Sequence, residues 1–97
     1  MAAYVIAGNN VADAEVMREY STLVPATLEP FGGRFVVRGG QVEVVEGAWT
    51  TSRLVVIEFP SLDHAKGWYH SDAYQAIIQM RFAAAKTDFL IFADGVG

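Results

Sequence analysis

The segment from Arg53 to Phe59 constrains the fold most strongly, because it reads as a β-strand with apolar side chains on both faces. Leu54 and Val56 alternate with Val55 and Ile57, whereas a half-solvated antiparallel strand would alternate apolar with polar side chains. The sheet therefore needs cover on two faces. A chain of 97 residues has enough helix for one face, so we expect a second copy of the protein to cover the other.

Turn and capping residues divide the chain into strand, helix, strand, strand, helix and strand. Strands are expected at residues 3–7, 34–38, 53–59 and 89–92, and turn residues follow the first strand at 8–10. Helices are expected to begin at Asp13 and Ser61. The second helix is expected to break near His70 and to restart at Ser71. This order is typical of the ferredoxin-like βαββαβ fold, an α+β architecture with an antiparallel sheet and helices on one face. The length predicts one domain, residues 1–97.

Residues 32–59 are expected to form a long twisted hairpin at the centre of the sheet. Residues 41–46 resume an extended pattern after a glycine pair, and Trp49 lies near the tip. Such an arm projects beyond a compact monomer, so a partner subunit is expected to receive it. In the preceding helix, Pro25 is expected to cause a kink or a break.

The charge balance argues against a nucleic-acid partner. Seven basic residues against eleven acidic ones give a net charge of −4, which repels a phosphate backbone. The chain has no cysteine, which excludes disulfides and thiolate catalysis. The N-terminus has no basic segment, and no apolar run reaches the ~18 residues of a membrane span. We therefore expect a soluble, cytoplasmic protein that neither binds nor crosses a membrane.

Several stretches in a fixed order resemble the domain of unknown function 1330 family. They are Pro25-Ala26-Thr27, residues 32–40 (GGRFVVRGG), residues 54–60 (LVVIEFP), Trp68-Tyr69, Ser71 and Tyr74-Gln75. The resemblance implies a dimeric α+β barrel, in which two ferredoxin-like subunits pack their sheets face to face. Relatives in that superfamily include cofactor-free monooxygenases, isomerases, haem-handling proteins and ligand-sensing domains. The family itself has no established reaction, so the resemblance implies fold and dimer rather than function.

Charged residues on the predicted strands are the first candidates for chemistry. Alternation along residues 34–38 places Arg34 and Arg38 on one face, and Glu58 lies on the adjacent strand. Charges in an otherwise apolar sheet need partners. Arg38 and Glu58 therefore form a structural ion pair or, as the alternative, anchor a carboxylate-bearing ligand, which a guanidinium fork suits. Arg34 is expected to be a solvated edge residue.

The two histidines lie six residues apart on or beside one helix. That spacing places His64 and His70 on opposite sides, so they do not chelate one metal ion. We expect no metal site and no cofactor. Each histidine is either solvent-facing or, in the functional alternative, a general base at the mouth of a pocket.

The helices supply the remaining candidates. Arg81 shares a helical stripe with Ile77 and Ile78, where it either extends outward to solvent or closes over a cleft. The helical aromatics are mostly expected to fill the core. In the superfamily the ligand cleft lies between helices and sheet, so the resemblance makes Tyr20 or Tyr69 candidates to line it.

Together these features predict a homodimer, joined through its sheet faces, that binds a small organic or acidic metabolite between helices and sheet. Cofactor-independent catalysis stays open, although the sequence contains neither a nucleophile motif nor a phosphate-loop motif. The alternative is a non-catalytic accessory, sensing or structural dimerisation module. An enclosed pocket of at least ~300 Å³ with converging polar groups favours the enzyme, and a filled interior favours the module.

Overall fold

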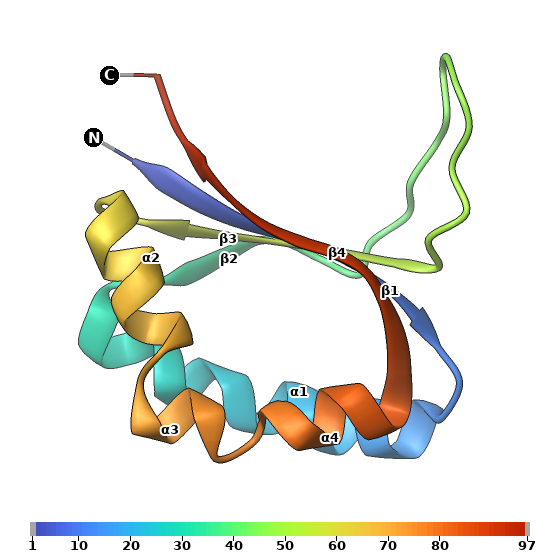
Figure 1. Cartoon of the computed structure of the whole chain (residues 1–97). Helices are drawn as coiled ribbons and strands as arrows, with labels where there is room; N and C mark the ends of the chain where they lie inside the picture. The colour runs from blue at the N-terminus through green and yellow to red at the C-terminus, as the bar shows by residue number, and fades with distance from the viewer. Residues whose placement is uncertain (1, 97) are drawn as a thin grey trace.

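The computed structural model describes residues 2–96, which form a four-stranded antiparallel sheet with helices on one face (Figure 1). The elements are β1 Ala3–Val11, α1 Ala14–Leu28, the 3-10 helix η1 Glu29–Phe31, β2 Arg34–Arg38, β3 Arg53–Phe59, α2 Leu62–Tyr69, α3 Asp72–Gln75, α4 Ile78–Ala84 and β4 Ala85–Asp94. The strand order is β2-β3-β1-β4. This arrangement confirms the predicted ferredoxin-like βαββαβ fold.

The pairing of the strands shows which apolar side chains lie on each face of the sheet. Val5 pairs with Ile57, and both are buried against the helices at 1% and 4% exposure. The neighbouring pair of Ile6 and Val56 points to the opposite face. On β4, Ile91 pairs with Ile6 of β1, and Ile91 is 48% exposed. The helices therefore cover one face, as predicted, and leave apolar side chains on the other, which we call the open face.

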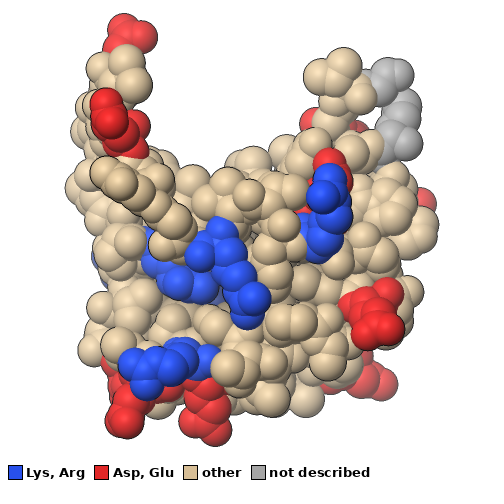
Figure 2. All heavy atoms as spheres, turned by 180° about the vertical axis from the view of Figure 1, so that it is seen from behind, with Lys and Arg blue, Asp and Glu red and all other residues tan. Residues whose placement is uncertain are grey.

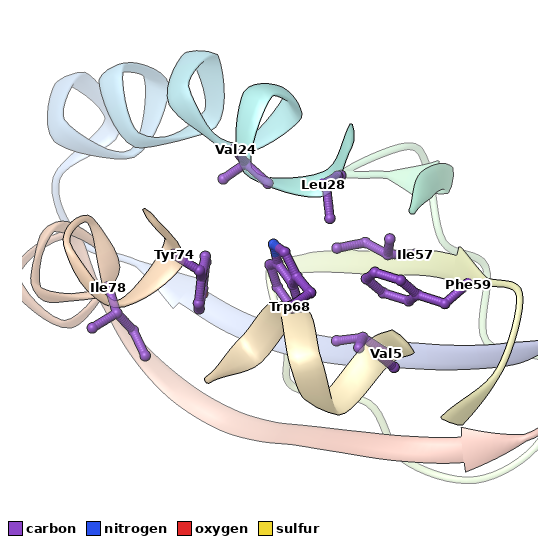
Figure 3. Close-up of a cluster of buried hydrophobic side chains, with 9 residues drawn as sticks. Val5, Val24, Leu28, Ile57, Phe59, Trp68, Tyr74 and Ile78 are labelled. Atoms are coloured by element: carbon purple, nitrogen blue, oxygen red, sulfur yellow. The ribbon is translucent and has the colours of Figure 1, made fainter. Parts of the chain in front are cut away.

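Trp68 is the centre of the core between the helices and the sheet. Its indole is 1% exposed and packs between Phe59 and Tyr74, at centroid distances of 5.6 and 4.2 Å (Figure 3). The indole nitrogen points towards α1, where it donates a hydrogen bond of 2.9 Å to Thr27 Oγ1. A buried indole N–H needs such an acceptor. This hydrogen bond fixes the position of α2 relative to α1.

The predicted helix signals are confirmed. Asp13 caps α1 by accepting from the Val16 amide at 3.1 Å. Ser61 and Ser71 cap α2 and α3 in the same way, so the second helical segment breaks near His70 as expected. Gly32, with a φ of +70°, ends the 3-10 helix after α1 in the left-handed conformation that glycine adopts readily.

The predicted central hairpin is wrong. β2 is an edge strand, and residues 41–46 are not a strand. Residues 39–52 instead form an irregular arm that leaves the sheet on the side opposite the helices (Figure 1). The chain turns away at Gly39, which has a φ of +69°. Val45 in the arm is 86% exposed, because the arm has no neighbouring strand with which to pair.

Trp49 does not point freely from the tip of this arm. Its ring packs edge-on against Phe89 of β4, with centroids 6.0 Å apart. Phe89 lies over Gly8 of β1, where a Cβ atom would come within 2.6 Å of the Phe89 ring. The missing side chain at Gly8 therefore makes room for the aromatic pair at the base of the arm.

The remaining differences concern the lengths of the elements. The expected turn at residues 8–10 is wrong, because β1 continues to Val11 beside β4 through a register shift between Gly8 and Asn9. β4 correspondingly spans ten residues instead of four. Pro25 does not split α1, which is one helix of 15 residues. Within residues 2–96, no helix is both long enough and apolar enough to cross a bilayer.

We expect the substitution Thr27→Val to lower the free energy of unfolding by about 1–3 kcal/mol, because the buried indole N–H of Trp68 loses its acceptor. Urea unfolding monitored by tryptophan fluorescence measures this loss.

The matched control uses Trp68→Phe, which removes the donor. In that background Thr27→Val should have a smaller effect, since no indole N–H remains to be satisfied. An equal loss in both backgrounds would show that the hydrogen bond contributes nothing to stability.

Candidate functional site

A cleft lies between α1, α4 and the helix-covered face of the sheet. Its inner part is a cavity of about 40 Å³, with apolar walls that include Val24, Ile57 and Leu90. An open groove of about 410 Å³ lies beside it. The cavity and the groove share four lining residues, Met17, Ser21, Arg38 and Arg53. The groove therefore leads into the cavity, and we call the two together the cleft.

Three arginines from three elements line the inner cavity: Arg38 of β2, Arg53 of β3 and Arg81 of α4. Within residues 2–96, none of them has a carboxylate within 4.0 Å, since the ion pair in this part of the chain joins Arg34 to Glu58. The cleft is thus electropositive in a chain of net charge −4. Figure 2 shows basic side chains gathered on one face of the molecule, with acidic side chains towards its edges.

Arg81 is the most unusual of the three, because its side chain is buried without a counter-ion. It is 3% exposed, and its Nε atom has no hydrogen-bond partner. Its Nη1 atom makes one long hydrogen bond of 3.4 Å to Thr87 Oγ1, which in turn donates to Asn9 Oδ1 at 3.2 Å. Removing a charge from water without a partner costs several kcal/mol. Arg81 therefore has unused capacity to bind an anion.

A β-bulge places Arg38 in the cleft. Phe35 pairs with Ile57 and Arg38 pairs with Val55, so the register shifts by one residue between them. The extra residue rotates Arg38 to the helix-covered face, opposite to the face that strict alternation predicts. There its guanidinium lies 4.2 Å from the centroid of the Phe35 ring, an arrangement that holds the cation by a cation–π contact.

Pro25 supplies the second anchor for Arg38. A proline has no N–H, so the carbonyl of Ser21, four residues earlier in α1, loses its usual helical donor. Arg38 Nη2 donates to this carbonyl at 2.6 Å. Pro25, which was predicted to kink or break the helix, leaves α1 as one helix and frees the acceptor that holds Arg38 at the mouth of the cavity.

Two tyrosine hydroxyls meet inside the cleft. The oxygens of Tyr20 and Tyr74 are 2.7 Å apart. Burial raises the pKa of Tyr20, and the neighbouring Tyr74 raises it further, while Arg81 and Arg53 act in the opposite direction. Burial also raises the pKa of Tyr74. Both phenols are therefore protonated at neutral pH, and the pair has an O–H left to donate to a ligand.

The charge of the cleft affects Arg53 directly. Burial lowers the pKa of the Arg53 guanidinium, and the nearby positive charge of Arg38 lowers it further. A bound anion would relieve this repulsion, because an opposite charge favours the charged form of arginine. The arginines, the hydroxyl pair and the apolar walls together suit a small molecule with an anionic group and an apolar body.

The structure brings together three of the predicted site residues: Tyr20, Arg38 and Arg81 all line the cavity. For Arg81, the alternative that extends outward to solvent is wrong, because the residue is 3% exposed and lines the cavity. Arg53 and Tyr74 also line the cavity but were not predicted as site residues. Alternation along β3 places Arg53 on the same face as Val55, so the sequence did contain a signal for it.

Glu58 lies elsewhere, and the predicted ion pair between Arg38 and Glu58 is wrong. Glu58 points to the open face, where Arg34 Nη2 lies 2.6 Å from Oε1 and the Tyr4 hydroxyl donates to Oε2 at 3.2 Å. The hydrogen bond from Arg34 lowers the pKa of Glu58 despite partial desolvation. The bulge explains the error, because it separates Arg38 from the face that Glu58 occupies.

The other three predicted residues do not line the cleft. His64 is exposed, with Nδ1 2.5 Å from Ser61 Oγ at the start of α2. His70 is exposed at the end of α2, edge-on to Tyr69. Tyr69 packs on Trp68 and Phe92 in the core. Among residues 2–96, no group of three His, Cys, Asp or Glu side chains is placed to hold a metal ion.

The sequence also matches a known family. The family described as "Domain of unknown function (DUF1330)" matches residues 2–95. The chain belongs to this family. No curated protein matches this DUF1330 chain significantly.

Solved structures share the fold of this DUF1330 protein. RPA0582 from Rhodopseudomonas palustris, a protein of unknown function, has a TM-score of 0.79 at 16% identity, over 99% of this chain and 83% of that one. A Caulobacter crescentus CB15 protein, named for a proposed role as an antibiotic biosynthesis monooxygenase, has a TM-score of 0.68 at 15% identity, over 99% and 91%. A conserved protein from Methanosarcina mazei Go1 has a TM-score of 0.61 at 17% identity, over 99% and 94%. At these identities the likeness shows the fold alone.

The unpaired charge of Arg81 generates a stability prediction. In the absence of ligand, Arg81→Met should raise the free energy of unfolding by about 1–4 kcal/mol, because an apolar side chain of similar length replaces a buried cation that has no carboxylate. Chemical denaturation of both proteins in a buffer free of organic acids measures the change.

The control is Arg34→Met, which removes an arginine that is paired with Glu58 on the open face and should not stabilise the protein. A loss of stability in Arg81→Met would show that the guanidinium has a structural role instead.

Proposed function

We propose that this DUF1330 protein is a homodimer that binds a small acidic metabolite in the cleft between α1 and the sheet. The observation that carries this proposal is the convergence of Arg38, Arg53 and Arg81 on one cavity without a carboxylate partner among residues 2–96. A guanidinium binds a carboxylate through two parallel hydrogen bonds, which gives both affinity and orientation. The cleft therefore suits an organic acid better than a neutral or cationic ligand.

The hydroxyl pair defines what chemistry the cleft can support. Tyr20 and Tyr74 are buried and protonated, so they can donate a hydrogen bond to a ligand carbonyl but are poor bases at neutral pH. An enzyme built on this cleft would use a phenol as hydrogen-bond or proton donor, with the arginines stabilising negative charge that develops on the ligand. This chemistry requires only the chain's own side chains.

A non-catalytic sensing or structural module is the second candidate. The cavity of about 40 Å³ is far smaller than the ~300 Å³ typical of ligand pockets. A ligand would place only one end inside it, with the rest in the open groove. A structural module that needs only its dimer would have no use for the unpaired arginines, so a binding measurement separates this structural module from a protein that binds a ligand.

The open face supports the dimer. It presents apolar side chains, with Ile91 48% exposed on β4 and Val36 44% exposed on β2. The arm leaves the sheet on the same side (Figure 1) and carries Val44 and Val45, at 47% and 86% exposure. A two-fold axis would cover both open faces at once, because the same patch then meets itself. Each arm would then lie against the partner.

Ligand binding is tested by thermal unfolding of the wild type with a panel of small carboxylic acids and their neutral amides. We expect at least one acid to raise the melting temperature, because a ligand that binds only the folded state stabilises it, and we expect the amides to have no effect. The rise should be lost in Arg81→Met. If no acid raises the melting temperature at millimolar concentration, the binding proposal fails and the structural module is favoured.

The dimer is tested by analytical ultracentrifugation at micromolar concentration. We expect the wild type to sediment as a dimer and Ile91→Glu to sediment as a monomer, because a charge would be buried at the centre of the apolar interface. Leu23→Glu is the matched control, since Leu23 is similarly exposed, at 42%, on α1 away from the open face. A wild type that sediments as a monomer contradicts the proposal.

A further inference from the structure

The geometry points to a ligand with two anionic groups, one at each end of a short molecule, and a small dicarboxylate is the ligand class that fits. This inference rests on the proposed function, because it concerns the same cleft. The cations that line the cleft form two groups. The cleft has one cationic pole inside the cavity and a second pole where the cavity meets the groove.

Arg81 forms the inner pole. It is 3% exposed, its Nε has no partner, and the cavity beside it holds about 40 Å³. A volume of this size accepts a few water molecules or one small polar group, so only the head of a ligand enters. A carboxylate there would accept from Arg81 and from the free O–H of the tyrosine pair, and would supply the missing counter-ion.

Arg38 and Arg53 form the outer pole. Both line the cavity and the groove, so they lie where the two meet. Arg38 is held by the Ser21 carbonyl at 2.6 Å and by the Phe35 ring. Two anchors of this kind fix the guanidinium before a ligand arrives, which reduces the entropic cost of binding. Arg18 also lines the groove and adds positive charge beyond the outer pole.

The two poles occupy different parts of the cleft, because Arg81 lines only the cavity, whereas Arg38 and Arg53 line both the cavity and the groove. The Tyr20 hydroxyl is near both poles, since Arg81 and Arg53 both act on its pKa. A single carboxylate at the inner pole would leave Arg38 and Arg53 facing each other without a counter-ion. A second carboxylate a few bonds away would neutralise them, while the apolar walls contact the short chain between the two groups.

This arrangement distinguishes a dicarboxylate from a compact dianion. Inorganic phosphate carries both charges on one centre, so it can occupy one pole but cannot bridge two. A monocarboxylate with the same number of carbons can occupy the inner pole and the apolar walls but leaves the outer pole empty. The preference for two separated charges is therefore a property that binding measurements can isolate.

The test is isothermal titration of the wild-type protein with succinate, glutarate and adipate, each paired with the monocarboxylate of equal carbon number, and with inorganic phosphate. We expect one dicarboxylate to bind at least about tenfold more tightly than its monocarboxylate, the effect of one additional charge-assisted hydrogen-bonded contact. Phosphate should bind more weakly than that dicarboxylate. This comparison needs no variant, so it does not depend on the folding of any mutant.

Two variants then assign the poles. Arg53→Gln should weaken binding of the dicarboxylate more than binding of the monocarboxylate, and Arg81→Met should weaken both. Lys66→Gln is the control for overall charge, because Lys66 is exposed on α2 and does not line the cleft. It should change neither affinity.

The outcomes separate this inference from the proposed function. Equal affinity for the two members of every pair, or an equal loss of both in Arg53→Gln, overturns the two-pole ligand but leaves acid binding intact. Phosphate that binds as tightly as the best dicarboxylate also overturns it, in favour of a single anion site. Failure of every acid to bind overturns both proposals.

Discussion

The structure depends on the packing of one helical layer against one face of a two-sided apolar sheet, and on where that packing stops. Trp68 fills the space beneath the C-terminal half of α1, where its indole donates to Thr27. Near the middle of α1, Tyr20 and Arg81 interrupt the apolar core, and a cavity remains. A second, smaller apolar cluster that includes Met17 and Ala84 lies beyond it. The same interface thus contains tightly packed core and, beside it, a cleft with polar groups.

Two local departures from regular structure position the outer arginine of that cleft. The bulge in β2 rotates Arg38 to the helix-covered face, and Pro25 frees the Ser21 carbonyl that accepts its hydrogen bond. Alone, the bulge in β2 or the proline in α1 would be a minor irregularity of its strand or helix. Together they fix an exposed guanidinium at the mouth of the cavity, which makes the bulge and the helical proline candidate features of the site instead of defects.

The cleft retains a cost that a purely structural interior would avoid. Arg81 is buried without a carboxylate among residues 2–96, although an apolar side chain could fill the same place. Polar groups that are poorly satisfied in the folded protein are typical of functional sites, where stability is exchanged for the ability to bind. On the opposite face, Arg34 and Glu58 satisfy each other. The contrast within one sheet supports the assignment of the cleft as the binding site.

Alternation and capping are local properties of neighbouring residues. They were therefore enough to predict the strands with two apolar faces, the caps at Asp13, Ser61 and Ser71, and hence the ferredoxin-like fold. It also indicated Tyr20, Arg38 and Arg81, although it placed Arg38 on the wrong face. The convergence of the three arginines could not be predicted, because a one-residue bulge reverses a strand's faces and leaves no reliable mark in composition or period. The position of the arm was likewise decided by a distant contact, that of Trp49 with Phe89.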